Sequence, residues 1–153
     1  MVKKLELIGS TYKSDHSSPG LLFWRSFLNW QRTLRQQLES YGITQAQYSV
    51  LAALYYLTSS GSEVTQQDIA NQLSMDKMMV SSLVKTLTAK KFIQRKEHSS
   101  DARAYALQIT KAGVAKIQQC VPIVESADEK FFRSTGDRYQ FFVECLRILA
   151  LKE

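Results

Sequence analysis

Residues 76–113 read DKMMVSSLVKTLTAKKFIQRKEHSSDARAYALQITKAG, and this stretch decides the fold. Its first part predicts a helix capped by Asp76, because apolar side chains recur at spacings of three and four and so share one face. We expect that buried face to consist of Met79, Val80, Leu83, Val84 and Leu87. Residues 92–97 and 104–109 then alternate between apolar and polar side chains, as paired strands do, with the polar stretch 98–103 between them. The stretch therefore predicts a helix followed by a β-hairpin with a charged tip.

A shorter helix is predicted just before this one. Thr65 and Asp68 have the spacing of a capping box at its start. Its buried stripe is expected at Ile69, Ala70 and Leu73. Two short helices followed by a β-hairpin make a winged helix-turn-helix. In that motif the second helix, here 76–91, fits a major groove, and the hairpin, here 93–109, reaches the adjacent backbone or minor groove.

Longer amphipathic segments flank the predicted winged region. One begins after Pro19 and stops before Gly42, Thr44 offers the cap of the next helix, and Thr110 caps a long helix that a last one follows. Pro122 lies inside the long helix and predicts a kink or a local break there. We therefore expect a mainly α chain with a small β-hairpin wing and with dimerisation helices at both ends. The expected organisation is a mobile lead-in at 1–19, a helical dimerisation region at 20–43 and 111–153, and a winged helix-turn-helix region at 44–110.

The composition narrows the class of protein. The chain has 153 residues, of which 44% are hydrophobic and 22% charged, as in an ordinary globular domain. Its 20 Lys and Arg outnumber its 14 Asp and Glu, so the net charge is +6, the pI is near 9.4, and a polyanion such as nucleic acid fits as a partner. No segment has the pattern of a signal peptide or a membrane span, and two cysteines cannot make a disulfide framework. We expect a cytoplasmic protein with no membrane partner.

The wing and the two helices before it resemble the MarR family of bacterial transcription regulators. Residues 101–113 are similar to that family's D-x-R-A-x-x-L followed by L-T-x-x-G, with Ile109 in place of the Leu before Thr110. The preceding helices match the family pattern at Ile69, Ala70, Leu73, Val80, Ser81, Leu83, Val84 and Leu87. Ser74 and Lys91 depart from it, because both stand where the family commonly has glycine. The resemblance covers roughly residues 20–150 and implies a dimeric, sequence-specific DNA-binding regulator that represses transcription and responds to a ligand.

Candidate DNA contacts fall on the predicted recognition helix. Met78, Ser82 and Lys85 point away from its buried face, and Lys77 and Ser81 lie beside them. A solvated helix face explains each of them almost as well, since Lys and Ser are common on any protein surface. The apolar surface of Met78 suits thymine methyl groups. Lys90, Lys91 and Lys96 are expected to add sequence-independent phosphate attraction at most.

The wing supplies two further candidates. The family resemblance implies that Arg103 enters the minor groove and that Asp101 holds it by an ion pair. A narrow minor groove has an enhanced negative potential that favours an inserted guanidinium. In an isolated Asp-x-Arg turn, both side chains would be expected to be simply solvated. The wing context favours the minor-groove role instead.

The outer helices predict partners of two kinds. Their apolar faces are larger than a small winged domain can cover, which predicts a homodimer on a pseudo-palindromic double-stranded DNA operator. The resemblance also implies a pocket for a small-molecule effector between the dimerisation helices and the winged region. Trp24, Arg25 and Trp30 are candidate ligand contacts, although aromatic side chains at helical spacing are more often core.

One alternative function remains open at this point. A winged-helix protein-interaction module without DNA binding would have the same fold, but it has no need of Asp101 and Arg103. Neither an enzyme nor a cofactor or metal site is expected, because the sequence has no acid, base and nucleophile constellation and no metal-ligand spacing. Cys120 and Cys145 fit small buried hydrophobes better than a redox switch.

Overall fold

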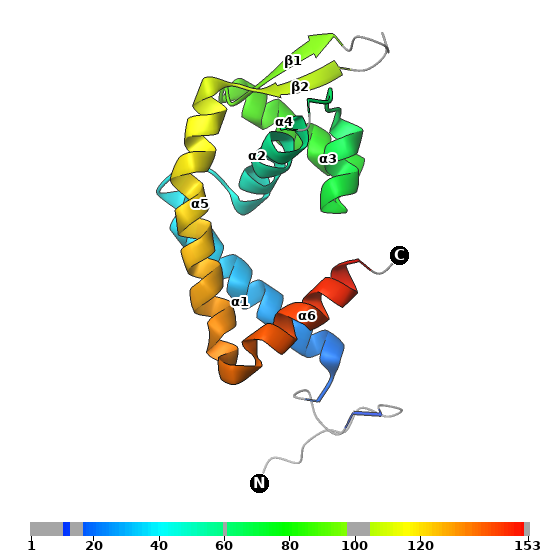
Figure 1. The fold of residues 1–153 in the computed structure, drawn as a ribbon, viewed down its shortest axis with the longest axis vertical. Helices are drawn as coiled ribbons and strands as arrows, with labels where there is room; N and C mark the ends of the chain where they lie inside the picture. Colours follow the sequence, from blue (N-terminus) through cyan, green and yellow to red (C-terminus); the bar gives the residue numbers. More distant parts are fainter. Residues whose placement is uncertain (1–10, 13–16, 60, 98–104, 152–153) are drawn as a thin grey trace, which may run out of the picture.

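The computed structural model describes residues 11–12, 17–59, 61–97 and 105–151. It is mainly helical with one antiparallel pair of strands, which confirms the predicted fold class. The elements in chain order are α1 (Pro19–Glu39), α2 (Gln45–Thr58), α3 (Gln66–Leu73), α4 (Lys77–Ala89), β1 (Ile93–Glu97), β2 (Tyr105–Ile109), α5 (Lys111–Phe132), the 3-10 turn η1 (Arg133–Arg138) and α6 (Tyr139–Ala150). Figure 1 shows α2, α3, α4 and the hairpin gathered at one end, α1 and α6 crossing at the other, and α5 running between the two ends.

The helices begin where the sequence predicts. Side-chain oxygens of four residues cap α2, α3, α4 and α5, namely Thr44, Thr65, Asp76 and Thr110. Asp76 Oδ1 accepts the backbone N–H of Met78 at 2.8 Å, and the backbone N–H of Thr65 donates to Asp68 Oδ2 at 2.8 Å. Each cap satisfies amides that have no partner inside their helix. The four predicted helix starts are confirmed.

The winged region supplies much of the hydrophobic core, which continues into α1 and α5. The fully buried side chains of α2, α3, α4 and the hairpin are Val50, Leu51, Leu54, Ile69, Val80, Val84, Leu87, Ile93 and Leu107. The strands pair with Ile93 opposite Ile109. The backbone N–H of Leu107 also donates to the carbonyl of Val64 at 2.7 Å, and these two residues form a single β-bridge. This bridge ties the start of α3 to the base of the wing.

Aromatic rings join α1 to α5 and α6. The indole N–H of Trp30 donates to Asp128 Oδ1 at 2.7 Å across the α1–α5 contact. The Trp30 ring centroid lies 6.1 Å from that of Phe132, which in turn lies 6.1 Å from that of Phe142. Leu34 and Leu38 of α1 are buried beside them. Tilted rings at such distances attract one another, so these rings link the three helices.

The long helix α5 is continuous through Pro122. It runs unbroken from Lys111 to Phe132, so the local break that Pro122 led us to expect does not occur. Proline removes one backbone hydrogen bond from a helix interior. Cys120 and Val124 on either side of Pro122 are buried against the core, and this packing keeps the helix intact across the missing bond.

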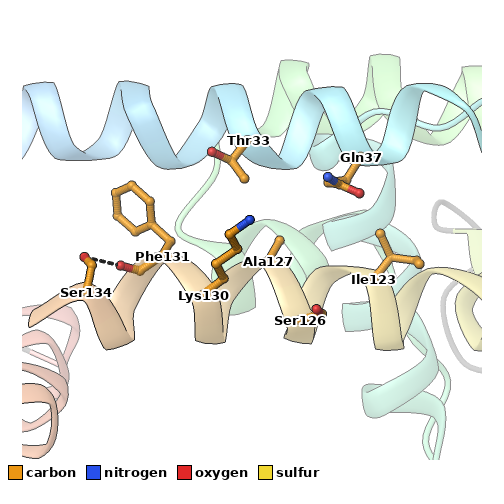
Figure 2. Close-up of a pocket in the computed structure, with 8 residues that line it drawn as sticks. All are labelled: Thr33, Gln37, Ile123, Ser126, Ala127, Lys130, Phe131 and Ser134. Atoms are coloured by element: carbon orange, nitrogen blue, oxygen red, sulfur yellow. Dashed lines mark hydrogen bonds between the residues drawn. The ribbon is translucent and has the colours of Figure 1, made fainter. Parts of the chain in front are cut away.

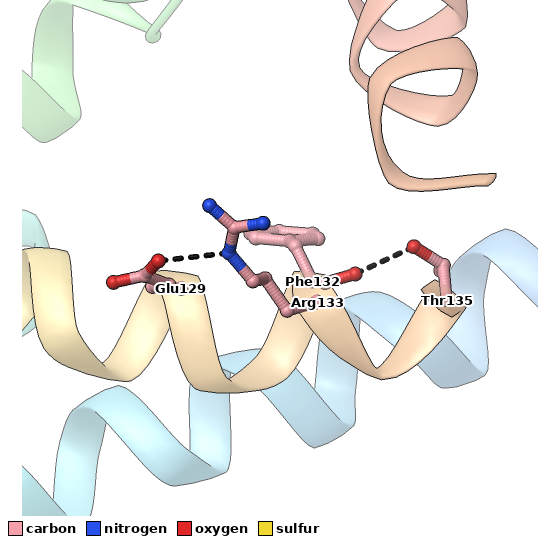
Figure 3. A network of polar contacts seen from close by, with 4 residues as sticks. All are labelled: Glu129, Phe132, Arg133 and Thr135. Atoms are coloured by element: carbon pink, nitrogen blue, oxygen red, sulfur yellow. Dashed lines mark hydrogen bonds and ion pairs between the residues drawn. The ribbon is translucent and has the colours of Figure 1, made fainter. Parts of the chain in front are cut away.

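A polar network closes α5 and leads into α6 (Figure 3). Arg133 Nε donates to Glu129 Oε1 at 2.8 Å, and Thr135 Oγ1 donates to the carbonyl of Phe132 at 2.7 Å. Gly136 follows with φ 61° and ψ −134°, a conformation that residues with a side chain rarely adopt. The chain therefore reverses here, and α6 returns across α1.

Two residues with side chains take left-handed backbone conformations. Ser74 and Lys91, which stand where the family has glycine, have φ of 49° and 61°. We expect Lys91→Gly to raise the free energy of unfolding in urea by up to about 1 kcal/mol, because relief of a strain of about 1–2 kcal/mol is partly offset by the greater freedom of the unfolded chain. Gly42→Ala is the control. Gly42 has a φ of 65°, so the added Cβ should strain the backbone and lower the free energy of unfolding. Equal stability of Lys91→Gly and the parent would contradict the strain.

Candidate nucleic-acid interface

The outward face of α4 carries the predicted contact residues. The side chains of Lys77, Met78, Ser82 and Lys85 are exposed, and Ser81 is half-buried at the edge of the face. On the opposite side of the helix, Val80, Val84 and Leu87 are fully buried against the winged core. One side of α4 is thus fixed in the protein, and the other is free to meet a groove of DNA. The roles of these five outward side chains as DNA contacts stay predictions.

Met79 corrects the buried face expected from the sequence. Its side chain is 52% exposed and lies next to Met78, which is 80% exposed. Residues in a helix advance by about 100°, so Met79 lies roughly a quarter turn from Val80 and Leu87 and falls at the edge of the buried stripe. Because its side chain is apolar, the sequence alone predicts that Met79 is buried. Met78 and Met79 together form an apolar spot at the start of α4, suited to thymine methyl groups.

Positive charge surrounds this face. Six basic side chains and no acidic ones occur between residues 77 and 96, the basic ones being Lys77, Lys85, Lys90, Lys91, Arg95 and Lys96. Arg95 and Lys96 are exposed on β1, beside the end of α4. Asp101 and Arg103 lie outside the described residues, so their assignment remains a prediction.

The side chain of Lys90 is hydrogen bonded within the protein. Its Nζ donates to the carbonyl oxygen of Gly42 at 2.7 Å and to Gln47 Oε1 at 3.1 Å. These acceptors are 48 and 43 residues away along the chain. No local sequence pattern marks such a contact, because it depends on how α2 and α4 pack.

A groove of about 470 Å³ lies between α1 and α5 (Figure 2). Its lining is partly polar and consists of Thr33, Gln37, Ile123, Ser126, Ala127, Lys130, Phe131 and Ser134. The three predicted ligand contacts of α1 are not part of this lining. Trp24 is 57% exposed, whereas Trp30 is half-buried and hydrogen bonded to Asp128. Contact of an effector with Trp24, Arg25 and Trp30 stays a prediction.

Two titratable groups at the α2–α5 contact, Cys120 and Tyr48, have raised pKa values. Burial raises the pKa of the Cys120 thiol, and the nearby Lys116 only partly opposes this. Burial also raises the pKa of Tyr48, and the charge of Glu125 acts in the same direction. Cys120 is fully buried, so it behaves as the small hydrophobe that the sequence predicts, whereas Cys145 is only half-buried.

Two further properties concern the part of the chain that the structure describes. Within it, His, Cys, Asp and Glu side chains do not gather in groups of three or more that could hold a metal ion. None of its helices is both long enough and apolar enough to cross a membrane.

Apolar side chains are exposed along α6 and the first half of α1. None of the α6 residues is buried. The exposed large apolar residues of this surface are Leu21, Leu22, Phe23, Trp24, Leu28, Phe141, Ile148, Leu149 and Leu151. Contiguous apolar surfaces of this kind mark sites of interaction.

Solved structures share this fold. BpsR of Bordetella bronchiseptica, whose DNA binding is regulated by 6-hydroxynicotinic acid, matches with a TM-score of 0.82 at 21% identity, over 94% of this chain and 100% of that chain. MepR of S. aureus, solved in complex with DNA, matches with a TM-score of 0.77 at 24% identity, over 87% of this chain and 97% of that chain.

Sequence comparison gives the family. The chain is 33% identical over 132 residues to YdcH of Bacillus subtilis (strain 168), an uncharacterized HTH-type transcriptional regulator, and the match covers 86% of this chain and 90% of that protein. The family model described as "MarR family" matches residues 43–105, which run from the start of α2 to the start of β2. The resemblance read from the wing motif is confirmed: the chain belongs to the MarR family.

Proposed function

We propose that this protein is a dimeric, sequence-specific DNA-binding transcription regulator, acting as a repressor that responds to a small-molecule effector. The observation that carries the proposal is the two-sided α4, which buries Val80, Val84 and Leu87 and turns Lys77, Met78 and Lys85 outward. A helix held in this way presents side chains at the depth needed to read a major groove. The fold shared with MepR on DNA supports the same function.

The exposed apolar surface of α1 and α6 supports the homodimer. A twofold dimer brings two copies of α4 to one face of the duplex, with half-sites centred about 10 base pairs apart or a multiple of that. The operator should then be a pseudo-palindrome. An effector that alters the contact between the dimer helices and the winged region would change the spacing of the two α4 helices, and BpsR is an example of a protein with this fold whose DNA binding is regulated by a small molecule.

Selection of genomic DNA fragments by the purified full chain tests the proposal. We expect enrichment of an inverted repeat, and a loss of enrichment with Lys85→Ala, which removes an exposed charge from the outward face of α4. Arg32→Ala removes one exposed charge from α1, a helix outside the winged region, and should leave the enrichment intact. If no fragment is enriched, the protein-interaction module becomes the better explanation of the fold.

The wing assignment makes a prediction with an informative sign. Arg103→Ala should weaken binding to the selected operator by about 1–3 kcal/mol, as expected for a minor-groove arginine. Asp101→Ala should weaken binding as well, because the carboxylate is expected to hold the guanidinium in place. A purely electrostatic model predicts the opposite sign, since deleting an acid near DNA reduces repulsion. Fluorescence anisotropy at two salt concentrations decides between them, and tighter binding by Asp101→Ala with normal binding by Arg103→Ala would refute the wing assignment.

A further inference from the structure

Two lysines from other elements hold the connection between α1 and α2. Lys90, the C-cap of α4, donates from Nζ to the carbonyl of Gly42 at 2.7 Å, and Lys116 of α5 donates from Nζ to the carbonyl of Tyr41 at 3.0 Å. Carbonyl groups at the C-terminal end of a helix lack partners and carry partial negative charge. The last turn of α1 has no basic residue of its own. Tyr41 and Gly42 lie just beyond Ser40, the C-cap of α1, so the two ammonium groups bind the turn that follows α1 and bring positive charge close to its C-terminal end.

Lys90 also reaches the first turn of α2. Its Nζ lies 3.1 Å from Gln47 Oε1, the same oxygen that accepts the backbone N–H of Thr44 at 3.2 Å in the α2 capping box. The side chain of Gln47 is buried, at 7% exposure. Lys90 thus links the end of the recognition helix to both sides of the α1–α2 connection.

Lys116 approaches the same connection from α5. Its Nζ lies 5.8 Å from the centroid of the Phe92 ring and 3.3 Å from Gln119 Oε1. Phe92 lies between the end of α4 and the start of β1. An ammonium over an aromatic face is attracted by the negative face of the ring. The second tie therefore also joins the α1–α2 connection to the segment that follows α4.

We propose that Lys90 and Lys116 are positioning residues, which fix the direction of α4 relative to α1 without contacting DNA. The proposal rests on the proposed function, because the direction of α4 matters only if α4 reads an operator. Hydrogen bonds from a charged donor are short and strong, so two of them on neighbouring carbonyls restrict how α1 and α4 turn against each other. Sequence-specific binding needs that angle in both protomers, whereas attraction to phosphates does not.

Substitution of each lysine by methionine, which keeps the apolar stem and removes the charge, tests the proposal. We expect Lys90→Met and Lys116→Met each to raise the Kd for the selected operator about tenfold, with the Kd for a scrambled duplex changing no more than in Lys91→Met. Lys91→Met is the matched control, since it removes the same charge one residue from Lys90. The slope of log Kd against log salt should equal that of the parent. Lys90→Arg retains a charged donor and should recover most of the discrimination.

Each other outcome has a definite meaning. Equal losses on both duplexes with a salt slope smaller by about one would make Lys90 a phosphate contact and overturn the proposal. If operator affinity is unchanged and the unfolding midpoint is lower, the lysine only stabilises the fold, and this result also overturns the proposal. All Kd values are measured at least about 20 °C below the unfolding midpoints, so that folding does not enter them. If the parent protein itself fails to distinguish operator from scrambled DNA, the proposed function fails before the variants are compared.

Discussion

Gly113→Ala should lower the free energy of unfolding by about 3 kcal/mol, even though alanine is the better helix former. Gly113 lies in the first turn of α5, where this helix crosses the base of the wing. A Cβ there would overlap the carbonyl oxygen of Phe92 and lie 2.7 Å from Ile109 Cγ1. The same Phe92 carbonyl accepts the backbone N–H of Thr110 at 3.0 Å, so it cannot withdraw without weakening the start of α5. Urea unfolding at a fixed protein concentration measures the loss.

Gly20→Ala is the matched control for this effect. Gly20 is the second residue of α1, and no atom lies within 4 Å of an added Cβ. Alanine at this position should be neutral or stabilise the protein by up to about 1 kcal/mol. Stability unchanged in both variants would contradict the close approach of α5 to the wing. The close approach also explains, in physical terms, the glycine of the L-T-x-x-G pattern.

If the proposed dimer forms through α6, the double substitution Ile148→Glu with Leu149→Glu should convert it to a monomer. Both side chains are 62% exposed on α6, and burying two carboxylates in an apolar interface is strongly unfavourable. We expect the dissociation constant of the dimer to rise by more than about 100-fold, measured by sedimentation velocity. Operator affinity should fall with it, because the two half-sites are no longer bound by linked copies of α4.

A charge added elsewhere serves as the control for the α6 variant. Gln72→Glu adds a carboxylate at an exposed position of α3, in the winged region, and should leave the dimer unchanged. A double variant that is still dimeric would place the interface away from α6. A parent protein that is monomeric at micromolar concentration would refute the dimer altogether.

Much of the fold follows from local patterns in the sequence. The caps at Thr44, Thr65, Asp76 and Thr110 and the alternation of the two strands are determined by neighbouring residues, so they can be read directly. Local rules failed where packing outweighed them. Pro122 predicts a kink or a local break, but α5 runs through it without a break, and its neighbours Cys120 and Val124 are buried.

The candidate site was only partly predictable for a related reason. The outward position of Met78, Ser82 and Lys85 follows from helix geometry once the buried stripe is recognised. Hydrophobicity alone predicts that Met79 lies in the core, whereas its angle around the helix puts it at the edge of the buried stripe. The hydrogen bonds of Lys90 join segments more than 40 residues apart and depend on tertiary packing, so no spacing in the sequence predicts them.

The unbroken course of α5 makes it a lever. Its 22 residues span about 33 Å, with the wing base at one end and the turn into α6 at the other. A rod of this length that swings by about 5° displaces its far tip by about 3 Å, close to the rise between successive base pairs. A tilt of α5 by about 5° would therefore displace the base of the wing by about the distance between two neighbouring base pairs.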